Sequence, residues 1–200
     1  RDCLLSRGLG DVYKRQGTPS LMSVAGFETL MNGLRERLPI AEDAEITLEA
    51  NPGTHEAARF AGYVANGVNR FSIGVQSFND ERLKALGRIH DRRQALQAVE
   101  TALKHVDNIN LDVMYALPGQ SMDGAVEDAC TAVASGATHL SFYELTIEEG
   151  TAFYKREPAG LPDNDTAAEM GETVASILAQ AGFEHYEVSG YAKPGHRCRH

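Results

Sequence analysis

The sequence predicts an α/β fold with a parallel sheet, and three observations lead to this prediction. Short apolar runs rich in β-branched and aromatic residues alternate with amphipathic helical stretches along the chain. Strands that alternate with helices in this way form right-handed βαβ units, whose strands pair in parallel. The chain has 200 residues, 42% of them hydrophobic, which is enough for one core. We therefore expect one sheet, either open or closed into a barrel.

The expected elements follow in chain order. The first helix is predicted at 23–38, because leucines recur on one of its faces and Ser20 or Ser23 can cap its start. The strands are predicted at 45–50, 70–78, 109–117 and 139–145. The helices that follow them are predicted at 54–66, 79–105 with a break near Gly87, 121–135 and 164–181. Asn164 or Asp165 can cap the last helix.

Composition excludes several classes of function. The net charge of −9 and the pI near 5.2 argue against a nucleic-acid partner held by bulk electrostatics. Cys3, Cys130 and Cys198 are too few and too scattered for a disulfide framework, and we expect Cys130 to pack in the core. No apolar run approaches the roughly 20 residues that cross a bilayer. We therefore expect a cytoplasmic protein that does not span a membrane.

The two ends of the chain differ from the rest. Residues 1–16 show neither helical nor alternating periodicity, and their apolar stretch is too short for a signal peptide. We expect this segment to be a non-native leader, with the domain at 17–200. The other end, KPGHRCRH at 193–200, stops without a closing element. We therefore expect the domain to be truncated at both ends and to belong to a longer protein.

Polar side chains occupy the carboxyl ends of the predicted strands, which is where parallel β/α arrays place their ligands. Glu49 ends the first strand in EITLEANPG, Gln76 lies near the end of the second, and Asp112 interrupts the third. Further polar residues at these ends are Ser77, Tyr115, Tyr143 and Glu144. Burying such groups without partners would cost a few kcal/mol each. We expect a ligand or a polar network to satisfy them.

Each residue also has a structural explanation. Glu49 could cap the next helix or neutralise an arginine, and Gln76 could bond backbone at a strand edge. Asp112 fits a structural role least well, because the flanking Leu111 and Val113 leave it facing a barrel interior or a ligand. Two carboxylates and an amide on one face together predict a pocket for a ligand that carries hydroxyls and positive charge.

Glycine and proline mark turns on the same face. GTPS at 17–20 leads into the first helix, while ANPG at 50–53 and ALPG at 116–119 directly follow strands. Neither GxGxxG nor GxxxxGK[ST] occurs, so no nucleotide-binding fingerprint is present. A single GTPS is weak evidence for any family. The ordered set GTPS, TLEANPG, GVQSFN, LGRIH, LDVMYALPGQ and LSFYELT is much stronger evidence.

Over 17–200, this ordered set resembles the radical S-adenosylmethionine (SAM) family of oxygen-independent coproporphyrinogen III oxidases, and most closely its haem-chaperone branch. The resemblance implies a partial parallel β/α barrel of the radical SAM type, with a 4Fe-4S cluster and SAM at the carboxyl ends of its strands. It also implies a set of SAM-contacting residues at the matching positions, namely Gly17, Thr18, Glu49, Gln76, Arg88 and Asp112.

The chemistry of SAM agrees with these residue types. SAM carries a sulfonium, an ammonium, a carboxylate and a ribose diol. Glu49 and Asp112 can accept hydrogen bonds from the cationic end and the diol, and Gln76 can both donate and accept. Arg88 can pair with the carboxylate of SAM. Taken alone, Arg88 would be a solvated arginine of a helix, and only the resemblance raises it to a ligand-binding residue.

The chain departs from the family in one respect. Radical chemistry there needs a CxxxCxxC loop, whose three thiolates hold three irons and leave the fourth for SAM. No such loop occurs in the 200 residues, and Cys3 stands in unrelated surroundings. We therefore predict no metal ligand and no catalytic residue in this chain. The cluster is expected only in the longer parent protein.

The last residues favour the haem-chaperone branch. His200 would be the first residue of the HNxxYW motif that the branch uses for haem, and Cys198 is a second candidate ligand. A solvated tail is the plain alternative for both. The leading hypothesis is a haem chaperone that binds SAM, a 4Fe-4S cluster and haem, and delivers haem to haem-dependent respiratory enzymes.

Two alternatives remain open. The first is an oxidase that decarboxylates coproporphyrinogen III through a radical, and turnover of that substrate would distinguish it. The second is a β/α barrel that binds a small ligand without redox chemistry, and iron content together with SAM binding would separate it from the others.

Overall fold

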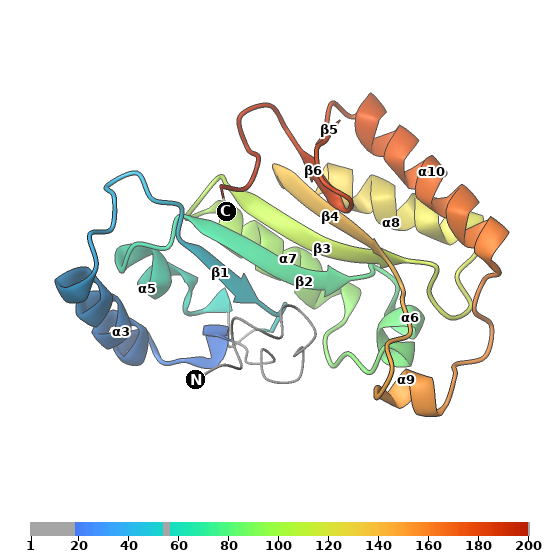
Figure 1. Ribbon diagram of the computed structural model, residues 1–200, viewed down its shortest axis with the longest axis horizontal. Helices are drawn as coiled ribbons and strands as arrows, with labels where there is room; N and C mark the ends of the chain where they lie inside the picture. The colour runs from blue at the N-terminus through green and yellow to red at the C-terminus, as the bar shows by residue number, and fades with distance from the viewer. Residues whose placement is uncertain (1–18, 54–56, 200) are drawn as a thin grey trace.

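The computed structural model describes residues 19–53 and 57–199, which form one six-stranded sheet covered by helices (Figure 1). The strand order is β1-β2-β3-β4-β6-β5. The strands span Thr47–Ala50 (β1), Arg70–Gln76 (β2), Ile109–Tyr115 (β3), His139–Glu144 (β4), Glu184–His185 (β5) and Gly190–Ala192 (β6). Within the described residues the sheet stays open, with β1 at one edge and β5 at the other.

The first four strands pair in parallel, and the last two are antiparallel. The α/β class and the parallel part of the sheet are therefore confirmed, and the open sheet agrees with a partial barrel. The hairpin β5–β6 was not predicted. Its strands contain two and three residues, which is too short for an alternating pattern to be visible in the sequence.

Five predicted helical stretches are found close to their predicted ranges, whereas the one-turn helix α9 was not predicted. They span Val24–Arg37 (α3), Phe60–Ala65 (α5), Asp80–Ala85 (α6), Arg92–Leu103 (α7), Met122–Ala134 (α8), Ala152–Lys155 (α9) and Asn164–Gln180 (α10), after a 3₁₀ turn at Pro19–Leu21 (η2). The expected break near Gly87 separates α6 from α7, and Gly87 has a φ of 71° that ends a helix at little cost. None of the described helices is long and apolar enough to cross a bilayer.

Two of the predicted details concern helix caps. Ser23 caps α3 as expected, because its hydroxyl accepts a hydrogen bond from the N–H of Gly26. The cap of α10 is Asp163, not Asn164 or Asp165. Asp163 has an extended backbone and accepts the N–H of Thr166, whereas the two predicted residues already lie inside the helix.

The apolar faces of the strands meet the helices in a single core. Figure 1 shows α7 and α8 behind the strands, with α10 beside α8. The largest fully buried side chains include Phe60, Tyr63, Phe71, Ile73, Leu111, Leu140 and Met170. The prediction for Cys130 was wrong, since this residue is exposed. The buried stripe of α8 runs through Ala125, Ala129 and Ala132, and position 130 falls outside it.

Candidate functional site

The face of the sheet opposite the core is polar. In β1, Leu48 and Ala50 are buried in the core, so Thr47 and Glu49 point the other way. In strand β3 the apolar side chains of Ile109, Leu111 and Val113 belong to the core, so the alternating residues Asn110 and Asp112 point to the polar face. The register aligns these rows, because Glu49 pairs with Ser72, Ser72 with Asn110, and Asp112 with Ser141. Polar side chains from four adjacent strands therefore lie together.

A cavity of about 480 Å³ opens on this polar face. Glu49, Gln76 and Asp112 all line it, although they lie on three different strands. The expected convergence of two carboxylates and an amide is thus observed. Other lining residues include Arg70, Ser72, Asn110, Ser141, Tyr143, Glu187 and Cys198. These residues give the cavity many hydrogen-bonding groups and little apolar wall.

Asp112 lies at the centre of the polar face. Its carboxylate accepts hydrogen bonds from the Ser72 hydroxyl at 3.0 Å and from the Asn110 amide at 2.9 Å. Burial raises the pKa of Asp112, an effect that these hydrogen bonds oppose and the charge of Glu49 reinforces. The pKa of Tyr143 is also raised, by the partial burial of its own hydroxyl, which lies 3.5 Å from Asp112. Asp112 is therefore poised to interact with a cation that enters the cavity.

Gln76 owes its position to an unusual backbone. It has a φ of 68°, in the left-handed region that non-glycine residues rarely adopt, and the register of β2 with β3 shifts between Ile73 and Gln76. Its amide lies over Gly74, where an added Cβ would be 3.0 Å from Nε2 of Gln76. The glycine of RFSIGVQ therefore leaves room for the Gln76 side chain.

Arg88 lies in the exposed segment between α6 and α7 and is not part of the described cavity lining. Partial removal from water lowers the pKa of Arg88, and the carboxylate of Asp112 acts in the opposite direction. The two groups are therefore close enough for their charges to interact. Gly17 and Thr18, the other predicted contacts of SAM, lie outside the described residues, and so does His200.

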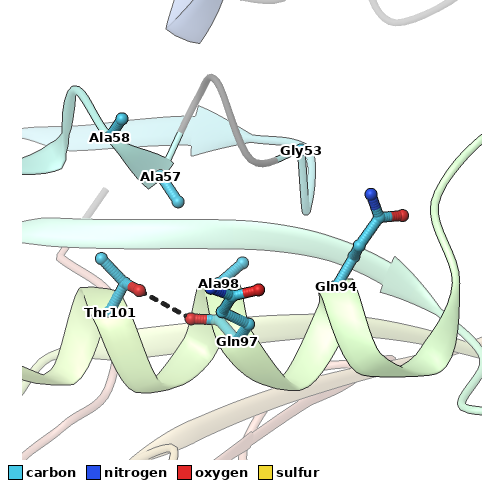
Figure 2. A pocket seen from close by; sticks show the side chains of 7 residues that line it. All are labelled: Gly53, Ala57, Ala58, Gln94, Gln97, Ala98 and Thr101. Carbon is cyan, nitrogen blue, oxygen red and sulfur yellow. Dashed lines mark hydrogen bonds between the residues drawn. The ribbon is translucent and has the colours of Figure 1, made fainter.

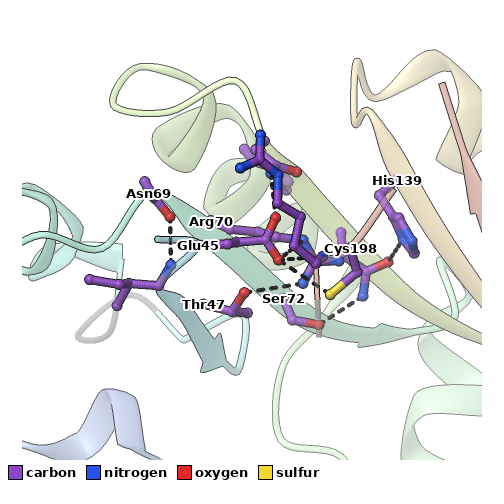
Figure 3. A network of polar contacts seen from close by, with 12 residues as sticks. Glu45, Thr47, Asn69, Arg70, Ser72, His139 and Cys198 are labelled. Carbon is purple, nitrogen blue, oxygen red and sulfur yellow. Dashed lines mark hydrogen bonds and ion pairs between the residues drawn. The ribbon is translucent and has the colours of Figure 1, made fainter. Parts of the chain in front are cut away.

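A polar network joins the segment before β1 to the end of the described chain, and Arg70 and Cys198 of this network also line the cavity (Figure 3). Glu45, just before β1, accepts hydrogen bonds from the thiol of Cys198 at 3.3 Å and from the N–H of Arg199 at 3.2 Å. Arg70, which is buried, places Nε 3.9 Å from Glu45 and donates to the hydroxyl of Thr47 at 3.4 Å. The last residues therefore cross the amino end of the sheet.

Cys198 is held here as a thiol. Burial raises its pKa, and the hydrogen bond to Glu45 acts in the same direction. Burial alone would also raise the pKa of Glu45, but the hydrogen bonds from Arg199 and Cys198 and the charge of Arg70 hold it below its ordinary value. The backbone N–H of Cys198 donates to the hydroxyl of Tyr186, which also bonds the ring of His139. Cys198 thus belongs to a network that joins the tail to β1 and β4.

Sequence reasoning missed one buried polar residue near the site. Asp128 is only 1% exposed, yet it stands in the alanine-rich helix α8. Its carboxylate accepts hydrogen bonds from the Ser77 hydroxyl, the Phe78 N–H and the Gln120 amide. The available signal was its spacing, three residues after Ala125 on the buried stripe of the helix.

A second cavity, of about 260 Å³, lies on the helix side of the sheet (Figure 2). Its described lining is Gly53, Ala57, Ala58, Gln94, Gln97, Ala98 and Thr101, none of which is charged. Gln94 is already engaged, since its side-chain oxygen accepts the N–H of Asp91 in the cap of α7. Among the residues that the structure describes, this lining offers no group suited to catalysis or to holding an ion.

Comparisons with known proteins agree with this geometry. The model of the radical SAM superfamily matches residues 7–129. The haem chaperone HemW of Escherichia coli K12 is 50% identical over 195 residues, covering 97% of this chain and 51% of that protein. HemW of Haemophilus influenzae is 42% identical over 201 residues, covering 100% of this chain and 52% of that protein. The chain thus spans about half the length of these relatives.

A solved structure shares the fold. Coproporphyrinogen III oxidase HemN from Escherichia coli, described as a radical SAM enzyme, superimposes with a TM-score of 0.82 at 25% identity. The superposition covers 90% of this chain and 42% of HemN. The superfamily match extends over more than half of the chain and includes β1, β2 and β3, which carry Glu49, Gln76 and Asp112. The chain belongs to the radical SAM superfamily.

Proposed function

We propose that this chain is the SAM-binding part of a haem chaperone of the HemW type. The observation that supports the proposal most directly is the convergence of Glu49, Gln76 and Asp112 in one cavity at the polar face of the sheet. The similarity to two bacterial HemW proteins supports the choice of the chaperone branch.

The lining of the cavity suits the cationic end and the diol of SAM. Glu49 and Asp112 supply carboxylate acceptors, and the amide of Gln76 supplies a donor and an acceptor. Arg88, whose charge interacts with Asp112, is the proposed partner of the SAM carboxylate. Gly17 and Thr18 are proposed to approach the amino-acid end of SAM through their backbone.

The residues present do not fit the cluster. Among the described residues no group of three His, Cys, Asp or Glu side chains could hold a metal ion, and the full 200-residue sequence contains three cysteines and no CxxxCxxC. We therefore assign the 4Fe-4S cluster to the parent protein and derive no chemical step through it. Within the proposal, residues 17–200 form the radical SAM core domain, which a non-native leader at 1–16 precedes.

Haem is the proposed cargo, delivered by the parent protein to haem-dependent respiratory enzymes. His200 is the proposed axial ligand, because imidazole is a standard ligand of haem iron. Cys198 is the second candidate, and it could bind haem iron only after its thiol leaves Glu45. The cytoplasm is the proposed location.

The experiment that tests the proposal is calorimetric titration of this chain with SAM and with S-adenosylhomocysteine. SAM should bind more tightly, because only SAM carries the sulfonium charge that the cavity carboxylates favour. Asp112→Asn should reduce the preference, whereas Asp123→Asn, at an exposed position of α8, should leave it unchanged. Equal affinities for the two ligands would contradict the proposal.

The likeness to HemN favours one alternative, a coproporphyrinogen III oxidase. The full-length parent protein should then convert coproporphyrinogen III under reducing conditions, whereas a chaperone should bind haem without turning over that substrate. A barrel without redox chemistry would show neither iron in the parent protein nor SAM binding.

A further inference from the structure

Two residues at the carboxyl ends of β2 and β3, the strands that carry Gln76 and Asp112, have backbone conformations that are unfavourable for their residue types. Gln76, at the end of β2, has a φ of 68°, and Ala116, just after β3, has a φ of 57°. Among the described residues these are the two non-glycine positions with positive φ. Such conformations persist only where surrounding contacts impose them. The contacts that hold both turns therefore fix how β2 and β3 end, and Gln76 at the first of these ends lines the cavity.

The turn after Gln76 is held by Asp128. The hydroxyl of Ser77 donates to Oδ2 of Asp128 at 2.8 Å, and the N–H of Phe78 donates to Oδ1 at 2.7 Å. Ser77 is fully buried and Phe78 nearly so. Two short hydrogen bonds from consecutive residues to one carboxylate fix the path of the chain directly after Gln76.

The turn after Ala116 reaches the same carboxylate through Gln120. The side-chain oxygen of Gln120 accepts the N–H of Leu117 at 3.1 Å, and its amide nitrogen donates to Oδ2 of Asp128 at 3.2 Å. Gln120 is 6% exposed, so water competes little for these bonds. The two strained turns are thus joined through a single side chain of α8.

A cation completes the arrangement. Arg82 of α6 places Nη1 3.5 Å from Oδ2 of Asp128 and donates to the carbonyl of Gly124 at 3.3 Å. Its guanidinium passes so close to Gly124 that a Cβ there would displace it. A glycine in the first turn of α8 therefore gives Arg82 its route to Asp128.

Packing alone does not require a carboxylate at this position. The neighbouring residues of the buried stripe of α8 are alanines, and a buried charge is unfavourable unless it is paired and hydrogen-bonded. The three groups that donate hydrogen bonds to Asp128, in Ser77, Phe78 and Gln120, belong to the two turns, and Arg82 of α6 adds the ion pair. Because these hydrogen-bond donors follow Gln76 and Ala116 closely in the chain, the carboxylate holds the turns at the ends of β2 and β3.

We propose that Asp128 is a positioning residue for the SAM cavity, which it shapes by clamping the left-handed turns at Gln76 and Ala116. This inference rests on the proposed SAM-binding function. Asp128 itself does not line the described cavity and acts through Ser77 and Gln120. Loss of the clamp should let both turns relax and should move the Gln76 amide away from its place over Gly74.

The test is a double-mutant cycle on SAM affinity, measured by calorimetry with Asp128→Asn, Ser77→Ala and the double variant. Each single variant should weaken SAM binding about fivefold to tenfold, and the double variant should be little weaker than either, because both changes remove one clamp. Val174→Ala, at a buried position of α10, is the control for a general loss of stability. It should lower the melting temperature and leave SAM affinity unchanged.

The outcomes separate this inference from the proposed function. If the wild-type chain binds SAM and the variants bind it equally well, or if Val174→Ala weakens binding as much as Asp128→Asn, the positioning role is wrong and SAM binding stands. If the wild-type chain does not bind SAM, both are wrong. Should Asp128→Asn fail to fold, Ser77→Ala combined with Gln120→Met gives an equivalent cycle, since each removes one of the two hydrogen bonds to Oδ2.

Discussion

Ser72 and Asp112 face each other from neighbouring strands, and the serine hydroxyl donates a 3.0 Å hydrogen bond to the carboxylate. Asn110 bonds both, with its amide nitrogen 2.7 Å from the Ser72 hydroxyl and 2.9 Å from Asp112. The carboxylate is thereby fixed in place before any ligand arrives. Such preorganisation lowers the entropic cost of binding.

The stability of the chain should carry a pH dependence that originates in Asp112. Its pKa is raised in the folded state, so its contribution to stability is full below about pH 4 and decreases as the pH rises through the folded-state pKa. Asp112→Asn removes this titration. The free energy of unfolding should be measured with urea from acidic to neutral pH. As the pH rises, the value for the variant should increase relative to that for the wild type. A constant difference between the two curves would show that Asp112 titrates normally.

Gly74→Ala should impair SAM binding with little effect on folding. The new Cβ would approach Nε2 of Gln76 to 3.0 Å and push the amide from its position. Calorimetry should show weaker SAM binding, and the melting temperature should change by no more than a few degrees. Gly33→Ala in α3 is the matched control, because its Cβ would meet only the flexible end of Arg37. There we expect up to about 1 kcal/mol of added stability and unchanged affinity.

Tyr186→Phe should loosen the C-terminal tail. The phenol hydroxyl bonds the ring of His139 at 2.7 Å and accepts the N–H of Cys198 at 3.1 Å. Removing it should cost roughly 1 to 2 kcal/mol in the free energy of unfolding, measured by chemical denaturation. Tyr154→Phe, at an exposed tyrosine of α9, should leave stability unchanged. Equal effects of the two changes would exclude a role of Tyr186 in holding the tail.

The two described cysteines should differ in reactivity. Cys130 is exposed, whereas Cys198 is partly buried with a raised pKa and donates its thiol to Glu45. Iodoacetamide at about pH 8 should therefore alkylate Cys130 faster, as followed by peptide mass spectrometry. Glu45→Gln removes the charge that holds the thiol and should bring the rate at Cys198 closer to that at Cys130. Faster alkylation of Cys198 in the wild type would contradict the tail contact.

The sequence was sufficient to identify the cavity residues that lie at the ends of parallel strands. Glu49, Gln76 and Asp112 stand in or beside apolar strands, and parallel strands end at the same edge of a sheet, so their convergence could be predicted. That rule does not reach Asp128, because its spacing places it on the buried stripe of α8 but its partners lie 8 to 51 residues away in the chain. The SAM and haem contacts assigned by resemblance stay predictions.

The sequence by itself determined the alternation of strands and helices and the presence of polar residues within apolar strands, because both depend on local periodicity. The tertiary structure decided which of these residues meet. It set the register that places Glu49 opposite Ser72, the left-handed turn at Gln76, and the contact of Cys198 with Glu45, 153 residues apart. These features arise from hydrogen bonds between distant segments, whose geometry is fixed only when the whole sheet has formed.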